Sequence, residues 1–138
     1  MTGDCPCGRS GSFGDTLPYD RCCGRYLGNG PDEAGSPAPD AESLMRSRYT
    51  AFALGRPDHL LATWDAGHAP GRLDLDRGLS WRGLTVLDHR VTGPDTAEVE
   101  FEARFVDAAG RRGRLHERSR FVRRDGRWYY LDGRIDPA

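Results

Sequence analysis

The sequence predicts an α+β fold, with short helices first and an antiparallel sheet after them. Three observations carry this prediction. Apolar residues recur at helical spacing between residues 40 and 64. After Gly78 apolar and polar residues alternate, as in half-buried strands. Turn signals at 107–113 and at Asp125-Gly126 separate the later strands. Two helices followed by a curled antiparallel sheet are typical of α+β proteins.

Two helices are expected before the sheet. Asp40 is a candidate N-cap for the first helix, which Gly55 and Pro57 end, and Asp58 can cap a second, short helix. The apolar residues at helical spacing are Ala41, Leu44, Met45, Tyr49, Phe52 and Ala53, then Leu60, Leu61 and Trp64. Residues 65–78 are polar and glycine-rich, with only a weak signal for a third helix.

The strands follow in order along the second half of the chain. Trp81, Leu84, Val86 and Leu87 open the sheet. Residues 97–105 alternate strictly between apolar and charged side chains, which predicts a half-buried strand. The next strand is expected over 115–123 and the last over 127–131, joined by the Asp125-Gly126 turn.

All four cysteines lie close to the N-terminus, as Cys5-Pro-Cys7 and, after fourteen residues, Cys22-Cys23. Thiolate is a soft ligand, and four thiolates in a tetrahedron suit Zn²⁺ while leaving no position for a substrate. The spacing therefore predicts one structural Zn²⁺ bound by these four residues.

Other roles for the cysteines stay open. Disulfides are typical of small secreted domains, but residues 1–4 lead into Cys5 without the apolar run of a signal peptide. Unligated or redox-active thiols are a further alternative, although the Cys-x-x-Cys spacing of many redox pairs is absent. An iron–sulfur cluster has no supporting motif here.

Composition argues against a general attraction to polyanions. The formal net charge is −1, and all twenty basic residues are arginine. Ten arginines and six acids fall in the last 38 residues, and because the two signs are interspersed, we expect a solvated sheet surface rather than a phosphate-binding face. No apolar run approaches the roughly 18 residues needed to span a membrane. We expect a cytoplasmic protein.

Two sets of residues resemble known families. CPCG at residues 5–8 with YDRCCG at 19–24 resembles the SEC-C motif, the zinc-binding knuckle at the C-terminus of the SecA translocation ATPase. Further blocks resemble the uncharacterised YchJ family, at residues 44–52, 60–64, 81–84, 117–121 and 126–133. This resemblance implies a nuclear transport factor 2-like (NTF2-like) cone, the fold also used by ketosteroid isomerases and polyketide cyclases. It implies no particular activity.

The expected organisation has three parts. Residues 1–27 form the SEC-C-like knuckle, residues 28–39 a glycine- and proline-rich linker, and residues 40–138 the NTF2-like domain. The loop between the cysteine pairs is longer than is usual in the family, but a longer surface loop costs little once it is closed.

The interior of the cone offers the candidate chemistry. Alternation places Glu117 on the same face as Leu115 and Phe121, where desolvation would raise its pKa. Helical spacing places Arg48 in the apolar stripe of the first helix, so the two side chains are expected to meet directly or through water. This pair is either a buried structural ion pair or part of a working pocket. His59 and His68 are each expected at the surface or at a helix cap.

Three functional hypotheses follow. The first is a zinc-binding module that docks a protein partner through the knuckle or takes a small ligand into the cone. The second is a cone-fold enzyme of isomerase, cyclase or dehydratase type, with Glu117 as the base and Arg48 or Tyr49 stabilising negative charge. The third is a nucleic-acid or ribosome-associated factor that uses the C-terminal arginines.

Overall fold

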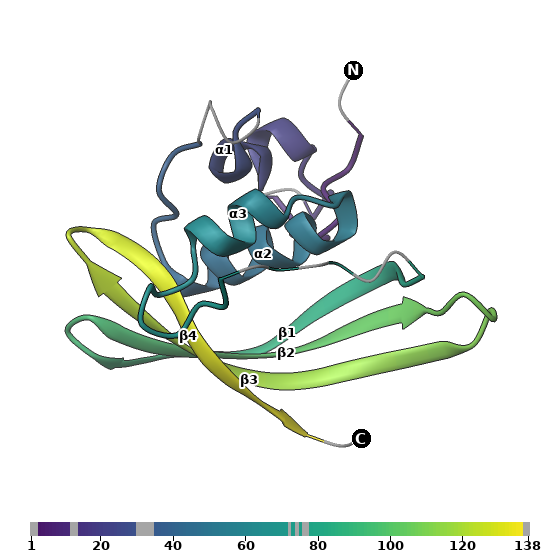
Figure 1. Cartoon of the computed structure of the whole chain (residues 1–138). Helices are drawn as coiled ribbons and strands as arrows, with labels where there is room; N and C mark the ends of the chain where they lie inside the picture. The colour runs from purple at the N-terminus through teal and green to yellow at the C-terminus, as the bar shows by residue number, and fades with distance from the viewer. Residues whose placement is uncertain are drawn as a thin grey trace.

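The computed structural model describes residues 3–11, 14–29, 35–71, 73, 75 and 78–136. Its elements in chain order are the 3₁₀ turn η1 (Tyr19–Arg21), the helices α1 (Gly24–Leu27), α2 (Ala41–Leu54) and α3 (Pro57–Ala62), and the strands β1 (Ser80–Gly93), β2 (Thr96–Val106), β3 (Arg112–Arg124) and β4 (Arg127–Asp136). Figure 1 shows one curved sheet with α2 and α3 on its concave side. The N-terminal segment with α1 lies beyond these helices, so α2 is the middle layer.

The sheet is a four-stranded antiparallel meander in the order β1-β2-β3-β4. The turn between β3 and β4 is the expected Asp125-Gly126 pair. Both residues have positive φ, 52° and 78°, which suits the twist of a two-residue hairpin. The loop between β2 and β3 is shorter than the sequence indicated, because β2 continues to Val106 and β3 begins at Arg112.

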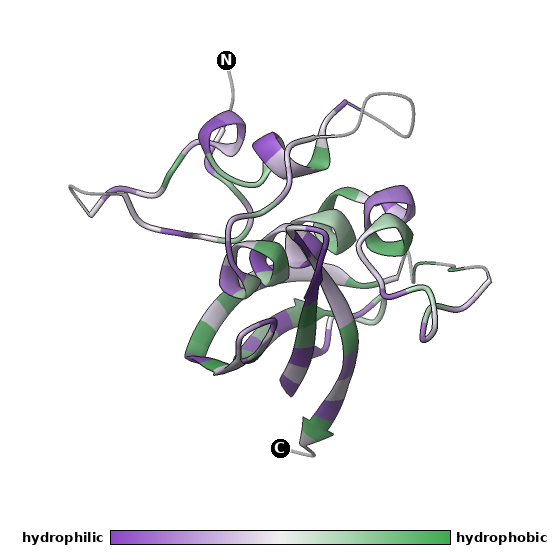
Figure 2. Cartoon of the chain, turned by 90° about the vertical axis from the view of Figure 1, so that its left-hand side faces the viewer, coloured by the Kyte–Doolittle hydropathy of each residue, from purple (hydrophilic) through white to green (hydrophobic). Residues whose placement is uncertain are grey.

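The strands alternate as expected between a core face and a solvent face, and Figure 2 shows this as alternating bands of hydropathy. In β2 the core side chains are Ala97, Val99, Phe101 and Ala103, all buried. In β3 the core positions include Ser119 and Phe121, which are 1 % exposed.

The solvent face of the sheet is a lattice of ion pairs. Arg118 contacts Glu98, Glu100 and Asp88. Arg120 forms an ion pair with Asp132 of β4. Several C-terminal arginines are therefore neutralised within the sheet, which favours the expected solvated surface over a phosphate-binding face.

The helix α2 begins and ends where the sequence predicted. The Asp40 carboxylate accepts a hydrogen bond from the backbone N–H of Ser43 at 2.7 Å, as an N-cap does. Gly55 adopts the left-handed conformation (φ 72°) at the C-terminus. Small polar residues of α2, including Ser47 and Thr50, are completely buried because the helix is covered on more than one side.

The second helix differs from the prediction in three respects. Asp58 does not cap α3: Arg56 occupies the N-cap position, Pro57 opens the helix, and Asp58 pairs with Arg56. The helix ends at Ala62, so Trp64 follows it and forms a bridge to Tyr130 of β4. No helix lies in the described part of residues 65–78.

Two side chains depart from their expected exposure. His59 was expected at the surface or at a cap, but it is 7 % exposed, because the underside of α3 packs onto α2. Phe52 is 38 % exposed although it shares the apolar stripe of α2.

Within the described residues, no helix has the length and apolar character needed to cross a membrane.

Candidate functional site

The four cysteines form one compact, buried cluster. Each is at most 3 % exposed, and all four Sγ atoms lie within 4.8 Å of one another. Cys7 Sγ and Cys22 Sγ are 3.5 Å apart, well beyond the roughly 2.05 Å of a disulfide, and all four thiols are free. A tetrahedral Zn²⁺ with bonds of about 2.3 Å would separate its sulfur ligands by about 3.8 Å. The donor set and its spacing therefore fit one ion.

Short backbone hydrogen bonds bring the two cysteine pairs together. The Cys5 N–H donates to the Leu17 carbonyl at 2.9 Å, which ties the first pair to the segment before the second. The Cys22 N–H donates to the Tyr19 carbonyl at 3.0 Å. The Cys23 carbonyl in turn accepts from the first turn of α1. The Leu17 N–H also donates to the Arg9 carbonyl at 2.9 Å, which joins the start of the long loop to its end.

The thiols influence one another's ionisation. Hydrogen bonds with Cys22, Cys23 and Cys7 lower the pKa of Cys5. The corresponding bonds with Cys22, Cys5 and Cys7 raise the pKa of Cys23. Ionisation of the first thiol is therefore favoured and ionisation of further thiols is disfavoured, as expected for like charges close together. A cation would balance the charge of four thiolates.

The cysteine cluster is fastened to α2 and is not an exposed appendage. Cys5 Sγ lies 3.8 Å from the Thr50 hydroxyl, and the Arg46 guanidinium donates to the Cys7 carbonyl at 3.2 Å. Leu27, 2 % exposed, belongs to the same buried cluster as the cysteines and the α2 core residues. The knuckle and the domain therefore share a core.

A second candidate site lies between α2 and the concave face of the sheet. It is a cavity of about 250 Å³. Its wall is mainly apolar and aromatic. Besides two tyrosine hydroxyls, its polar side chains are Arg48, Glu117 and Ser119. The lining residues are Met45, Arg48, Tyr49, Phe52, Trp64, Leu73, Trp81, Phe101, Ala103, Leu115, Glu117, Ser119, Phe121 and Tyr130.

Arg48 is held at this cavity without a carboxylate partner among the residues that the structure describes. Its Nη1 donates to the Leu60 carbonyl at 2.7 Å and to the Thr63 hydroxyl at 2.8 Å. The guanidinium lies over the rings of Tyr130 and Trp64, 4.4 Å and 5.2 Å from their centroids. Burial lowers the pKa of Arg48 to about 10, so the side chain still carries its charge at neutral pH.

Glu117 faces the cavity, as the alternation predicted, but does not form a direct ion pair with Arg48. Its Oε2 accepts hydrogen bonds from the Ser119 hydroxyl at 2.5 Å and from the Tyr130 hydroxyl at 3.3 Å. Oε1 has no hydrogen-bond partner among the described residues. Burial, followed by the charge of Glu117, raises the pKa of Tyr130, so its hydroxyl stays a donor.

Tyr130 connects the two predicted residues, contacting Arg48 with its ring and Glu117 with its hydroxyl, a role that was not predicted from the sequence. A signal was present in the register, because Tyr130 pairs with Phe121 on the inward face of β3. Tyr49 also lines the cavity, with its ring edge-on to Trp81 at 5.9 Å, but no hydrogen bond joins it to Glu117.

Gly133 explains how Glu117 fits against the sheet. It lies on β4 opposite Ser119, and a Cβ atom at this position would overlap the Glu117 carboxylate. A glycine inside a strand often marks such a close approach. The Glu117 carboxylate thus occupies the space left by the absence of a side chain at Gly133, and the Ser119 and Tyr130 hydroxyls hold it there.

Comparison with known proteins agrees with this architecture. The model of the middle, NTF2-like domain of YchJ matches residues 40–133. A UPF0225 protein of Methylibium petroleiphilum is 59 % identical over 134 residues, covering 96 % of this chain and 89 % of the relative. A UPF0225 protein of Streptomyces coelicolor is 47 % identical over 134 residues, with 96 % and 95 % covered.

A solved structure is similar over nearly the whole chain. The solution structure of a SEC-C motif containing protein from Rhodopseudomonas palustris superimposes with a TM-score of 0.76 at 33 % identity, covering 98 % of this chain and all of that one. These similarities confirm the NTF2-like α+β fold and the N-terminal cysteine cluster. The division at residues 27 and 39 stays a prediction.

Proposed function

The chain belongs to the YchJ family, together with relatives named UPF0225, and we propose that this member is a zinc-stabilised protein that binds a small ligand in its cone. The apolar cavity carries the ligand proposal, because it contains a carboxylate oxygen, Glu117 Oε1, that no described residue satisfies. The buried cluster of Cys5, Cys7, Cys22 and Cys23 carries the zinc proposal.

Zn²⁺ at the four cysteines would be structural. Four thiolates fill a tetrahedral site and leave no position for a substrate. The ion would hold the two cysteine pairs together and keep Leu27 packed beside α2. The similarity to a SEC-C motif containing protein supports this choice of metal.

Elemental analysis of protein purified without added metal tests the zinc proposal. We expect about one zinc per chain, the stoichiometry of one closed site. Exchanging Cys22 and Cys23 for serine should abolish it, whereas Ser10→Ala in the intervening loop should leave it unchanged. Less than about a tenth of an equivalent, with all four thiols reactive, would exclude zinc.

The cone should select a small ligand that is mainly apolar and donates one hydrogen bond. Its volume of about 250 Å³ exceeds the roughly 150 Å³ that holds benzene and lies below the range of drug-sized pockets. Seven of its fourteen described lining residues are aromatic. Glu117 would accept a hydrogen bond from an O–H or N–H group, while Arg48 provides a fixed positive charge nearby.

Phenol and toluene are matched probes for this proposal, because they have the same size and only phenol carries a donor. We expect NMR titration with phenol to shift the amide signals of Ser119 and Tyr130, with affinity at least about fivefold above that of toluene. Glu117→Met should remove this preference. Glu102→Gln, on the solvent face of β2, is the control. Failure of both probes to perturb cavity residues would contradict the proposal.

A further inference from the structure

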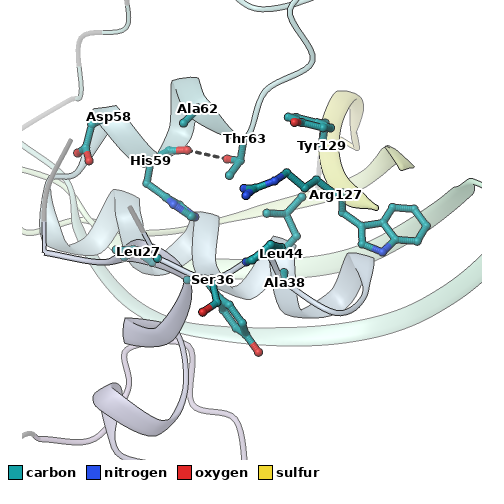
Figure 3. A pocket seen from close by; sticks show the side chains of 14 residues that line it. Leu27, Ser36, Ala38, Leu44, Asp58, His59, Ala62, Thr63, Arg127 and Tyr129 are labelled. Atoms are coloured by element: carbon teal, nitrogen blue, oxygen red, sulfur yellow. Dashed lines mark hydrogen bonds between the residues drawn. The ribbon is translucent and has the colours of Figure 1, made fainter. Parts of the chain in front are cut away.

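A second pocket lies beside α2, where Leu27 at the end of α1, the linker residues 35–38, the helix α3 and the start of β4 meet. Its volume is about 260 Å³. Figure 3 shows the side chains around it, with His59 and Thr63 from α3 and its end, and Arg127 and Tyr129 from β4. Its apolar wall is formed by Leu27, Pro37, Ala38, Leu44, Ala62 and Trp128.

Arg127 brings an uncompensated positive charge to this pocket. Its side chain makes no hydrogen bond or ion pair with any described residue, and Figure 3 shows it directed across the pocket toward Thr63. The nearby carboxylate, Asp58, is engaged at both oxygens by Arg56, at 2.9 Å each. Among the described residues, the pocket therefore offers a free guanidinium and no free acid, which suits an anion.

His59 adds an acceptor of defined orientation. The Ser47 hydroxyl donates its single hydrogen to the Leu44 carbonyl at 2.7 Å, so its oxygen can only accept from His59 Nε2, 2.9 Å away. Burial, followed by the charges of Arg48 and Arg56, lowers the pKa of His59 to about 4, so the ring is neutral at pH 7. A neutral ring with hydrogen on Nε2 has a lone pair on Nδ1.

This Nδ1 atom is available to a ligand. No described residue forms a hydrogen bond with Nδ1. Every fully buried side-chain nitrogen or oxygen in the described part of the chain does have a partner. The Nδ1 atom is therefore not sealed off from solvent, and the pocket is the space that His59 lines. One side chain thus supplies a cation to the pocket and another supplies a neutral acceptor.

We propose that this pocket binds a small organic carboxylate that also carries an O–H or N–H donor. The carboxylate contacts Arg127, the donor contacts His59 Nδ1, and the carbon skeleton packs against Leu27, Leu44 and Trp128. Scaling from the roughly 150 Å³ that holds benzene gives room for about ten non-hydrogen atoms. This site is separate from the cone cavity, so its test is independent of the phenol test.

The probes are 4-hydroxybenzoate, 3-hydroxybenzoate and 4-aminobenzoate, compared with the uncharged 4-hydroxybenzamide and with benzoate, which lacks the donor. NMR titration should shift the amide signals of Ala62, Thr63 and Tyr129. We expect at least one of the three acids to bind at least about tenfold more tightly than the amide, and more tightly than benzoate. No site-specific shift from any of the three acids would overturn the proposal.

Two variants separate the two contacts. Arg127→Gln should reduce the affinity of the acid about tenfold and bring it level with the amide, whereas Arg111→Gln, in the loop before β3, should have no effect. His59→Leu removes the Nδ1 acceptor and supplies no other, while Ser47 keeps its bond to the Leu44 carbonyl, so the folded variant should bring the substituted acid level with benzoate. Unchanged affinity in Arg127→Gln, with intact folding, would equally overturn the proposal.

Discussion

The guanidinium carbon of Arg48 lies 4.4 Å from the centroid of the Tyr130 ring. Tyr130 therefore stands between Arg48 and Glu117, contacting the first with its ring face and the second with its hydroxyl. The two charged residues share a cavity without sharing a hydrogen bond. Arg48 is stabilised by aromatic faces and neutral oxygens, which leaves one Glu117 oxygen for another partner.

This arrangement predicts the order of coupling energies. Arg48→Met should destabilise by about 3 kcal/mol, because it loses two buried hydrogen bonds and a desolvated cation–π contact. Its coupling to Tyr130→Leu should be about 1 kcal/mol or more. Its coupling to Glu117→Gln should be smaller, since these two side chains share a cavity and a charge attraction but no direct contact. Denaturant unfolding of the two double-mutant cycles measures both values, and the reverse order would indicate a direct ion pair.

The buried ring of His59 predicts a pH window for stability. Its pKa is lowered from 6.5 to about 4, chiefly by burial. Above pH 6.5 the ring is neutral in both states. Between pH 6.5 and 4 the unfolded chain binds the proton first, so the free energy of unfolding falls as the pH is lowered, and below pH 4 this loss levels off. The shift corresponds to about 3 kcal/mol.

Urea unfolding at pH 7.0 and pH 4.0 gives the loss of unfolding free energy between the two pH values, which is then compared between the natural chain and its variants. His59→Gln should lose about 3 kcal/mol less than the natural chain between the two pH values. His89→Gln is the control, because the His89 ring makes no hydrogen bond with a described residue and its Nδ1 lies 3.8 Å from the Glu42 carboxylate, so its loss should leave the difference nearly unchanged. Acids with lowered pKa, such as Asp58 and Asp65, also weaken the fold at low pH, but they contribute to every variant.

Local signals in the sequence predicted most of the backbone. The Asp40 cap, the Gly55 end and the Asp125-Gly126 turn each depend on a few neighbouring residues, and all three are confirmed. The Asp58 cap was wrong because Pro57 can itself open a helix, which moves the start forward and leaves Asp58 free to pair with Arg56.

The sites were less predictable because they depend on contacts between distant segments. Alternation placed Glu117 on the inner face correctly. It could not show that Tyr130, thirteen residues further on, would come between Glu117 and Arg48. His59 is buried because α3 folds back onto α2, where its ring contacts Ser47. The residues around His59 in the sequence do not predict this contact.

The shared core predicts how metal removal acts. Chelation should release amide protection over residues 5–27, since the cysteine pairs would lose their common ligand. It should also lower the melting temperature of the remainder by about 10 °C, because Leu27 and the Thr50 face of α2 lose their cover. Hydrogen exchange should still find β2 and β3 protected. Complete unfolding on chelation, or an unchanged melting temperature, would contradict this expectation.

Gly133 predicts that a single methyl group can displace the Glu117 carboxylate. In Gly133→Ala the new Cβ would lie 2.5 Å from Glu117 Cδ and closer still to Oε2, so the carboxylate must move away from Ser119 and Tyr130. We expect a loss of about 1–2 kcal/mol in unfolding free energy, from the broken hydrogen bonds.

The same variant tests the role of Glu117 in the cone without changing its charge. Phenol should lose its advantage over toluene in Gly133→Ala, as in Glu117→Met, because the acceptor is no longer held at its place in the cavity. Gly71→Ala is the matched control, since a Cβ there meets no atom within 4 Å. If Gly133→Ala kept both the natural stability and the phenol preference, then Glu117 would not be positioned by Gly133, and the cavity acceptor would have to be another group.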